Sequence, residues 1–158
     1  LTPLNPFVNI VIKMIAGMVL GLLAVVATYV AGAVAGIQLT AVQWIVTGLV
    51  GWLLASAVFT TLGLFVGYLM PSENAAQVTS LIVVFLSFLG GLFYPLNSMP
   101  DFMQTIARFT PVYGIGELAR SPLTGESFDA LWLVNALVWL AVFIAGTTWA
   151  FRRDTQRV

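Results

Sequence analysis

Cysteine and histidine are both absent from the 158 residues. Without cysteine there is no disulfide framework and no thiolate site, and without histidine the chain lacks the commonest metal ligand and the usual general base. Charge is scarce as well, because six basic and six acidic residues make up only 8% of the chain and cancel to a net charge of zero. This balance offers no electrostatic attraction to polyanions, so we expect no nucleic-acid partner.

Apolar residues are what the chain has in excess. Hydrophobic residues make up 60% of it, and its mean hydropathy is +1.02. Soluble domains are roughly a quarter charged, and the few polar residues here cannot cover the surface of a water-soluble fold. The chain starts at Leu1, and no basic segment with a cleavage site precedes its apolar stretches, so we expect it to be a piece of a longer protein.

Four uncharged stretches are long enough to cross a bilayer as helices, because a hydrocarbon core of about 30 Å needs about 20 helical residues. They cover residues 14–37, 44–70, 75–94 and 130–151. Ser72 is a candidate N-cap for the third of them. The sequence therefore predicts an all-α transmembrane protein with four membrane-spanning helices in a single domain over residues 1–158.

The distribution of basic residues predicts the orientation. Lys13 precedes the first span, and three of the five arginines follow the last one. The positive-inside rule then places both ends, residues 1–13 and 152–158, in the cytoplasm, and the long loop of residues 95–129 outside. Multi-pass insertion in a plasma membrane follows, with lipid as an obligatory partner.

Small residues recur at helical spacing within the spans. The pairs Gly17–Gly21, Gly32–Gly36 and Gly63–Gly67 each place glycine one turn apart, which permits close packing of helix backbones. In the first span the small surface continues through Ala24, Thr28, Ala31 and Ala35. We expect that face to pack against protein.

The loop of residues 95–129 has helical signals without the length to span. Ser98-x-x-Asp101 has the pattern of a capping box that opens a short helix through about Phe109. Thr110-Pro111 is typical of a second N-cap and first turn, and Ser121-Pro122 predicts that helix's end. An external re-entrant helical hairpin before the last span is one interpretation. A helix lying on the membrane surface is the other.

A pair of opposite charges lies on the second of these short helices. Glu117 and Arg120 are spaced i,i+3, which allows an ion pair on one helix face. Pairing lowers the cost of a charge at membrane depth, which is roughly 2.5 to 3.5 kcal/mol for an unpaired one. In the surface-helix interpretation the same pair is solvated.

Catalysis is not expected of this chain. The interiors of the four predicted spans contain no Asp, Glu, Lys, Arg or His, so an intramembrane hydrolase or an ion-coupled carrier has no ionisable group to use. The phosphate-binding pattern G-x-x-x-x-G-K-[ST] is also missing. We therefore expect no metal and no cofactor in this chain, and any ATP and Mg must belong to a partner.

Four runs of residues resemble the membrane permease subunits of type-2 ABC transporters, the export class for drugs, lipids and polysaccharides. Residues 90–100, GGLFYPLNSMP, resemble the family's pattern at the outer end of its fifth span, and residues 110–113, TPVY, with Arg120 beyond them, resemble the following external helix. Residues 2–7, TPLNPF, are similar to the cytoplasmic coupling segment before the third span. Residues 72–77 fit the short link between the fourth and fifth spans.

The resemblance covers essentially the whole chain and implies a function. The spans would be the family's third to sixth, and the permease would pair with a second permease copy or paralogue and with an ABC-type ATP-binding subunit. The implied substrate is amphiphilic or hydrophobic, and the implied location is a bacterial inner membrane. The implied coupling residues are Thr2, Pro3, Leu4, Asn5, Pro6 and Phe7. The implied external gate comprises Gly90, Gly91, Phe93, Pro95, Met99, Pro100, Pro111, Tyr113, Glu117 and Arg120.

Two other functional classes remain open from the residues alone. A channel or secondary carrier would use sparse hydroxyls such as Ser56, Thr60 and Ser87, although such groups usually bond to their own helix backbone. A non-transporting membrane scaffold would share every feature of composition. Residues 4–7 would then be an ordinary interfacial anchor.

Overall fold

The computed structural model describes residues 6–70 and 72–155, and over those residues the chain is helical without a strand. A π-helix, Val50–Ala55, joins the second and third α-helices into one rod, and a short 3-10 helix, Leu96–Ser98, precedes the fifth. The α-helices are α1 Pro6–Val34, α2 Ala41–Leu49, α3 Ser56–Leu69, α4 Ser72–Leu89, α5 Asp101–Arg108, α6 Pro111–Thr124 and α7 Ala130–Thr155. The predicted all-α class is confirmed.

Three helical segments of the described chain are long and apolar enough to cross a membrane. They are Phe7–Val34, Ala41–Leu69 and Ala130–Arg153, which correspond to the first, second and last predicted spans. The apolar part of α4, Glu73–Leu89, is shorter. The third predicted span, residues 75–94, therefore stays a prediction, and with it the total of four.

The helix α4 ends before the residue at which the sequence predicted its end. We expected it to continue to Tyr94, but it stops at Leu89 because Gly91 adopts a left-handed φ of +78°. The amide of Leu92 then turns back and donates to the carbonyl of Ser87 at 3.0 Å, the closing bond of a Schellman-type helix end. The end prediction was wrong by one turn or more.

The first and last helices extend beyond the predicted spans. α1 begins at Pro6, so part of the predicted coupling segment continues the first span as helix. The charge of Lys13 is tolerated within it, because its Nζ donates to the hydroxyl of Tyr68 at 2.8 Å and lies 4.7 Å from the ring centre. α7 runs on to Thr155, and its last turn carries Arg152 and Arg153, where cations favour the helix dipole.

The rod formed by α2, the π-helix and α3 begins with a cap that the sequence prediction overlooked. Thr40 accepts from the amide of Gln43 at 3.3 Å, and the Gln43 side chain accepts from the amide of Thr40 at 2.8 Å. This reciprocal pair is a capping box, so the helix begins at Ala41 rather than at the predicted Trp44. In the π-helix, Trp52 donates from Nε1 to the carbonyl of Met18 on α1 at 2.9 Å.

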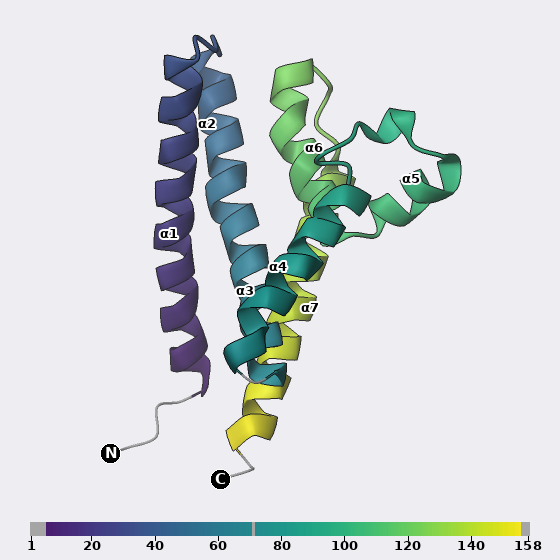
Figure 1. Ribbon diagram of the computed structural model, residues 1–158. Coiled ribbons are helices and arrows are strands. Elements are labelled where there is room, and N and C mark those ends of the chain that lie inside the picture. Colours follow the sequence, from purple (N-terminus) through teal and green to yellow (C-terminus); the bar gives the residue numbers. More distant parts are fainter. Residues whose placement is uncertain (1–5, 71, 156–158) are drawn as a thin grey trace.

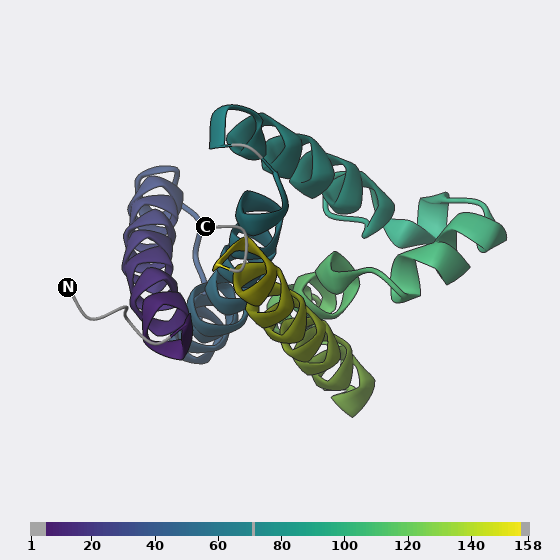
Figure 2. The same cartoon turned by 90° about the horizontal axis from the view of Figure 1, so that it is seen from below.

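The core lies where α3 packs against α7, with α6 covering one end. Val58, Leu62 and Val66 of α3 meet Ala136 and Phe143 of α7, and Ile115 of α6 joins them. Thr147 of α7 donates to the carbonyl of Thr61 of α3 at 3.1 Å, and both threonines are fully buried. Figures 1 and 2 show α1 beside the α2–α3 rod and α4 diverging from the bundle, and Figure 1 shows α6 at the end away from the start of α1 and the end of α7.

The small-residue prediction is confirmed at two positions only. A Cβ built on Gly17 would lie 2.9 Å from the Cβ of Thr60, and one on Gly21 would lie 2.8 Å from the Cβ of Ser56, so α1 meets the rod there at close range. The rest of the small surface on α1, Ala24, Thr28, Ala31 and Ala35, is exposed on this chain. Gly67 has open space around it.

These glycines provide a matched pair of substitutions. We expect Gly17→Leu to separate α1 from α3 and to destabilise the fold by about 1–3 kcal/mol or more, the usual cost of overpacking a filled site. Gly67→Leu should leave stability within about 0.5 kcal/mol, as surface changes do. The midpoint of thermal unfolding in mild detergent measures both. Equal midpoints for the two variants would contradict this packing.

Candidate functional site

The predicted gate residues meet where the end of α4 contacts α6. Gly90 and Gly91 are both buried there. A Cβ on Gly90 would lie 2.7 Å from the Cβ of Val112 in α6, and one on Gly91 would lie 2.6 Å from the Leu96 side chain. Gly90 thus lets the end of α4 approach α6 at a distance that a larger residue would prevent, and Gly91 leaves room for the Leu96 side chain of the 3-10 helix.

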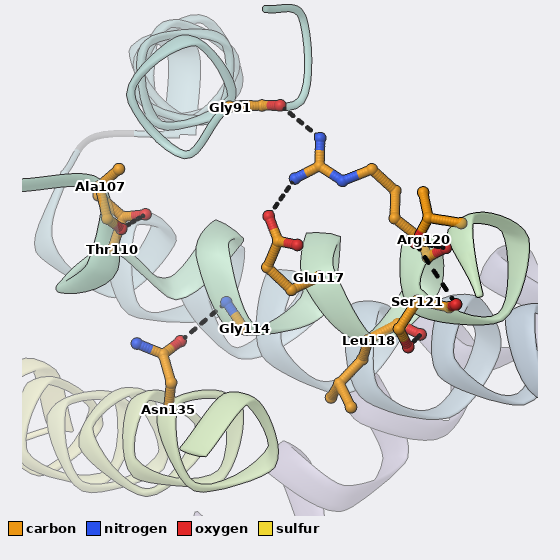
Figure 3. A network of polar contacts seen from close by, with 10 residues as sticks. Gly91, Ala107, Thr110, Gly114, Glu117, Leu118, Arg120, Ser121 and Asn135 are labelled. Carbon is orange, nitrogen blue, oxygen red and sulfur yellow. Dashed lines mark hydrogen bonds and ion pairs between the residues drawn. The ribbon is translucent and has the colours of Figure 1, made fainter. Parts of the chain in front are cut away.

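Arg120 joins the same two helices through a forked contact. Its Nη1 donates to the carbonyl of Gly91 at 2.8 Å, and its Nη2 donates to Oε1 of Glu117 at 2.6 Å (Figure 3). The carbonyls at a helix end lack helical partners, and here a guanidinium supplies one. The predicted Glu117–Arg120 pair is present, with side chains that are 17% and 32% exposed.

Asn135 of α7 holds the beginning of α6. Its Oδ1 accepts from the amide of Gly114 at 3.2 Å (Figure 3), and its Nδ2 donates to the carbonyl of Arg108 at 2.9 Å. Trp139 adds a bond from Nε1 to the carbonyl of Phe109 at 3.0 Å. The sequence prediction missed these residues, although a lone amide in the apolar stretch 130–151 is a signal for a buried polar contact.

The carboxyl end of α6 is tied to α2. Pro122 lies inside the helix, so the prediction that Ser121-Pro122 ends it was wrong. Proline removes the amide that would bond to the carbonyl of Leu118, and the Ser121 hydroxyl lies 3.4 Å from that carbonyl. Gln43 of α2 donates from Nε2 to the carbonyl of Pro122 at 2.8 Å.

The capping predictions for α5 and α6 were only partly right. Ser98 lies in the 3-10 helix, and Pro100 precedes α5 without a side-chain cap, so the predicted capping box was wrong. Thr110 and Pro111 do occupy the N-cap and first positions of α6. The Thr110 hydroxyl, however, donates back to the carbonyl of Ala107 at 2.7 Å instead of capping, because the two helices adjoin directly.

A polar cavity of about 330 Å³ opens beside α6. One face of α6 supplies Tyr113, Glu117, Arg120 and Thr124 to its wall. The segment after α4, the helix α5, the loop after α6 and the start of α7 supply the rest, namely Pro95, Leu96, Asn97, Gln104, Arg108, Glu126 and Trp132. Two arginines and two glutamates make this lining electrically neutral.

The remaining predicted gate residues lie around this junction. Phe93 is 62% exposed and stacks on Phe88, with ring centres 4.9 Å apart. Met99 precedes α5 and its carbonyl accepts from the Gln104 side chain at 2.8 Å. Pro111 is buried at the start of α6. Of the ten predicted gate positions, Pro95, Tyr113, Glu117 and Arg120 share the cavity wall.

The described part of the predicted coupling segment, Pro6 and Phe7, lies at the opposite end. Thr2, Pro3, Leu4 and Asn5 fall outside the described residues, Pro6 begins α1, and the Phe7 side chain is 70% exposed. One turn or two further on, Lys13 contacts Tyr68 of α3, whose ring meets Phe151 of α7 edge-on at 5.2 Å. This end of α1 is therefore joined to both core helices.

No cluster for a metal ion occurs in the part of the chain that the structure describes, where no three acidic, cysteine or histidine residues gather. The contacts of the site join one helix, α6, to three others. α6 is bonded to α2 through Gln43, to α4 through Arg120 and to α7 through Asn135. A movement of any of these helices must strain or break a contact with α6.

Comparison with known proteins identifies relatives of this arrangement. A family model described as "ABC-2 type transporter" matches residues 2–124. The chain is 32% identical over 129 residues to a protein described as "Putative transport permease YvfS" from Bacillus subtilis (strain 168), an alignment that covers 80% of this chain and 52% of that protein. The chain thus spans about half the length of this relative. No solved structure matches it.

Proposed function

Because the chain belongs to the ABC-2 type transporter family, we propose that it is the four-span part of a permease that exports an amphiphilic or hydrophobic substrate, such as a drug, lipid or glycan-lipid, with energy from a separate ATP-binding subunit. The observation that carries the proposal is the bonding of α6 to three other helices at once. A gate of this kind opens only when those helices move together.

The position of α4 supports a fourth span. Its 17 residues from Glu73 to Leu89, most of them apolar, extend about 26 Å at 1.5 Å per residue, close to the hydrocarbon thickness of about 30 Å. Leu81 and Phe85 are 70% and 64% exposed along it, as expected for a surface that faces lipid or a second permease. Figure 1 shows the start of α1 and the end of α7 at one end, which agrees with an even number of crossings.

The burial of α6 supports its place as a re-entrant external gate. Val112, Ile115 and Leu118 are buried against the other helices. Polar backbone at membrane depth is tolerated where protein covers it, so α6 meets the condition for entering the outer leaflet. In this proposal α5 and α6 close the exit, and the Arg120 contact holds them shut.

Coupling to ATP is proposed for the end of α1. Closure of two ATP-binding subunits, one under each of two paired permeases, would displace residues 2–7. The contacts from Lys13 to Tyr68 and from Tyr68 to Phe151 would pass this displacement to α3 and α7. At the far end of α7, Asn135 is hydrogen-bonded to Gly114 of α6, so a displacement of α7 would reach α6.

The test is co-purification of an ABC-type ATPase with the full-length permease in mild detergent. We expect wild type to retain the ATPase and Phe7→Asp to lose most of it, because a charge at a buried contact is costly to desolvate. Phe109→Asp is the matched control, since Phe109 is 73% exposed at the opposite end, against 70% for Phe7.

Two outcomes would count against the proposal. Loss of the ATPase in the Phe109→Asp variant as well would show a general folding defect rather than coupling at α1. Absence of any ATPase from wild type, under conditions that preserve other such complexes, would contradict the ATP-driven mechanism and favour a channel or a scaffold.

A further inference from the structure

The π-helix Val50–Ala55 interrupts the rod Ala41–Leu69 near its middle. In a π-helix the backbone bonds join residues five apart instead of four, so the turn holds an extra residue. Such turns occur mostly as single interruptions of α-helices, frequently at functional sites, and sharp kinks of long helices concentrate at them. This turn is therefore where the rod bends most easily.

The packing of the rod changes at the same turn. On its carboxyl side α3 is fixed in the core, where Val58, Leu62 and Val66 are buried against α7. On its amino side α2 buries no residue, and the π-helix itself buries none. Trp52 attaches the turn to α1, because its Nε1 donates to the carbonyl of Met18 at 2.9 Å. The two halves of the rod thus differ in how firmly the bundle holds them.

Open space flanks the π-helix on two sides. A groove of about 410 Å³ lies between the rod and α1, and Gly51 and Ala55 line it. A second groove, of about 430 Å³, lies between the rod and α6, and Val50 and Leu54 line that one. Protein interiors are close-packed and compress little, so a bend of the rod needs space of this kind.

Gln43 joins α2 to one end of α6. Its Nε2 donates to the carbonyl of Pro122, near the carboxyl end of α6, at 2.8 Å. The amino end of α6 is held on α7 instead, through the bond between Asn135 and Gly114. A bend of the rod at the π-helix therefore moves the carboxyl end of α6 and leaves its amino end in place.

Tyr29 joins α2 to the second half of α1, residues 22–34. Its hydroxyl donates to the carbonyl of Trp44 at 2.7 Å. Within Phe7–Val34 only Ile10 is buried, so the second half of α1 is free to follow α2. The Thr28 hydroxyl also bonds to the carbonyl of Ala24 at 2.8 Å, a contact that often bends helices.

We propose that the π-helix Val50–Ala55 is a hinge, at which α2 bends against α3 and swings the carboxyl end of α6 about its amino end. Arg120 lies toward the swinging end, so the movement changes its bond to the carbonyl of Gly91. The hinge is a property of the fold alone. Its part in opening an exit rests on the external gate proposed above.

Distances between pairs of spin labels test the hinge in the full-length permease, freed of any other cysteine and mixed with excess unlabelled protein. Val42→Cys with Val142→Cys joins α2 to α7, and Gly67→Cys with Val142→Cys joins α3 to α7, all at exposed positions. Double electron–electron resonance in nanodiscs measures both distance distributions. We expect the first to be broader than the second by several ångström. Equal widths would overturn the hinge.

Deletion of Gly51 tests whether the π-helix causes the bend. The deletion removes the extra residue, so that α2 and α3 join as a continuous α-helix. The matched control is Gly51→Ala, whose Cβ would lie 3.5 Å from Cγ2 of Val25, an ordinary contact. We expect the deletion to narrow the α2–α7 distribution to the width of the α3–α7 one, and Gly51→Ala to leave it broad. A folded deletion variant with an unchanged distribution would overturn the π-helix as the hinge.

A third label tests the swing of α6 separately. Leu123→Cys with Val142→Cys should give a distribution as broad as the α2–α7 pair, and Gln43→Ala should narrow it while the α2–α7 distribution stays broad. A narrow Leu123 distribution beside a broad α2–α7 one, without the Gln43 substitution, would overturn the swing. These measurements use no ATPase, so a failure of the exporter proposal leaves them interpretable.

Discussion

Replacing Arg120 by leucine is expected to lower transport at least tenfold while the protein still inserts in the membrane. The variant loses two charge-assisted bonds, one to Gly91 at 2.8 Å and one to Glu117 at 2.6 Å. Because the Arg120 side chain is 32% exposed, solvent screens part of this loss, and we expect a cost of about 1–3 kcal/mol. The transport rate is measured as uptake or efflux of a fluorescent amphiphile by cells that express the full-length transporter.

Two further variants separate the gate contact from the charge alone. Arg120→Lys keeps the charge but has no fork with which to reach both partners, so it should restore little of the lost transport. Glu117→Gln removes one partner and leaves the Gly91 contact, so we expect a milder loss. Wild-type transport in Arg120→Lys would show that the charge matters and that the contact with the end of α4 does not.

The second large effect is expected at Gly114. A Cβ there would lie 2.7 Å from Oδ1 of Asn135 and would clash with the backbone carbonyl of Trp132. Backbone cannot rotate out of the way as a side chain does, so Gly114→Leu must push α6 off α7 and break the Asn135 bonds. We expect a destabilisation above about 3 kcal/mol, which is enough to prevent accumulation of the folded protein.

Gly116 provides the control for that substitution. A Cβ at Gly116 would lie 3.2 Å from Cδ2 of Leu92, the end of a flexible side chain that can move. Gly116→Ala should therefore fold and lower the unfolding midpoint only slightly. Both variants are measured by the yield of monodisperse protein in detergent and by thermal unfolding. A normal yield of Gly114→Leu would contradict the close contact of α6 with α7.

Local patterns in the sequence predicted the features that depend on local contacts. Thr110-Pro111 marked the start of α6, and the i,i+3 spacing of Glu117 and Arg120 gave the ion pair. Hydropathy gave three of the helices that are long enough to span. The capping box of Thr40 and Gln43 was equally readable, and its omission misplaced the start of α2.

Other features depend on contacts between residues far apart in the chain, and no local pattern contains them. α1 continues through Lys13, whose charged Nζ donates a hydrogen bond to the hydroxyl of Tyr68, 55 residues away. Pro122 remains inside α6 although proline leaves the carbonyl of Leu118 without its helical donor, and the Gln43 side chain, 79 residues away, donates to the carbonyl of Pro122 itself. The π-helix Val50–Ala55 contains no proline, so its sequence has no signal for a break in the α-helical pattern.

The site was predictable as a set of residues but not as a set of contacts. The resemblance to a permease family indicated Gly90, Gly91 and Arg120, and the structure brings the three together. It gave no reason to expect that Arg120 binds a backbone carbonyl of Gly91, since backbone groups look alike in every sequence. Asn135 and Gln43 were missed because each acts on the backbone of another helix.

Four crossings that place α5 and α6 on the external side of the membrane are tested most directly by site-specific labelling, because these 158 residues contain no cysteine. Single substitutions Glu73→Cys, Asp101→Cys, Glu126→Cys and Arg153→Cys in the full-length permease are exposed to a membrane-impermeant maleimide on intact cells. We expect labelling at Asp101→Cys and Glu126→Cys, and labelling of Glu73→Cys and Arg153→Cys only after permeabilisation. If α4 did not cross, Asp101→Cys would match Glu73→Cys and stay unlabelled, while Arg153→Cys would be labelled from outside, and that result would contradict the four-span permease.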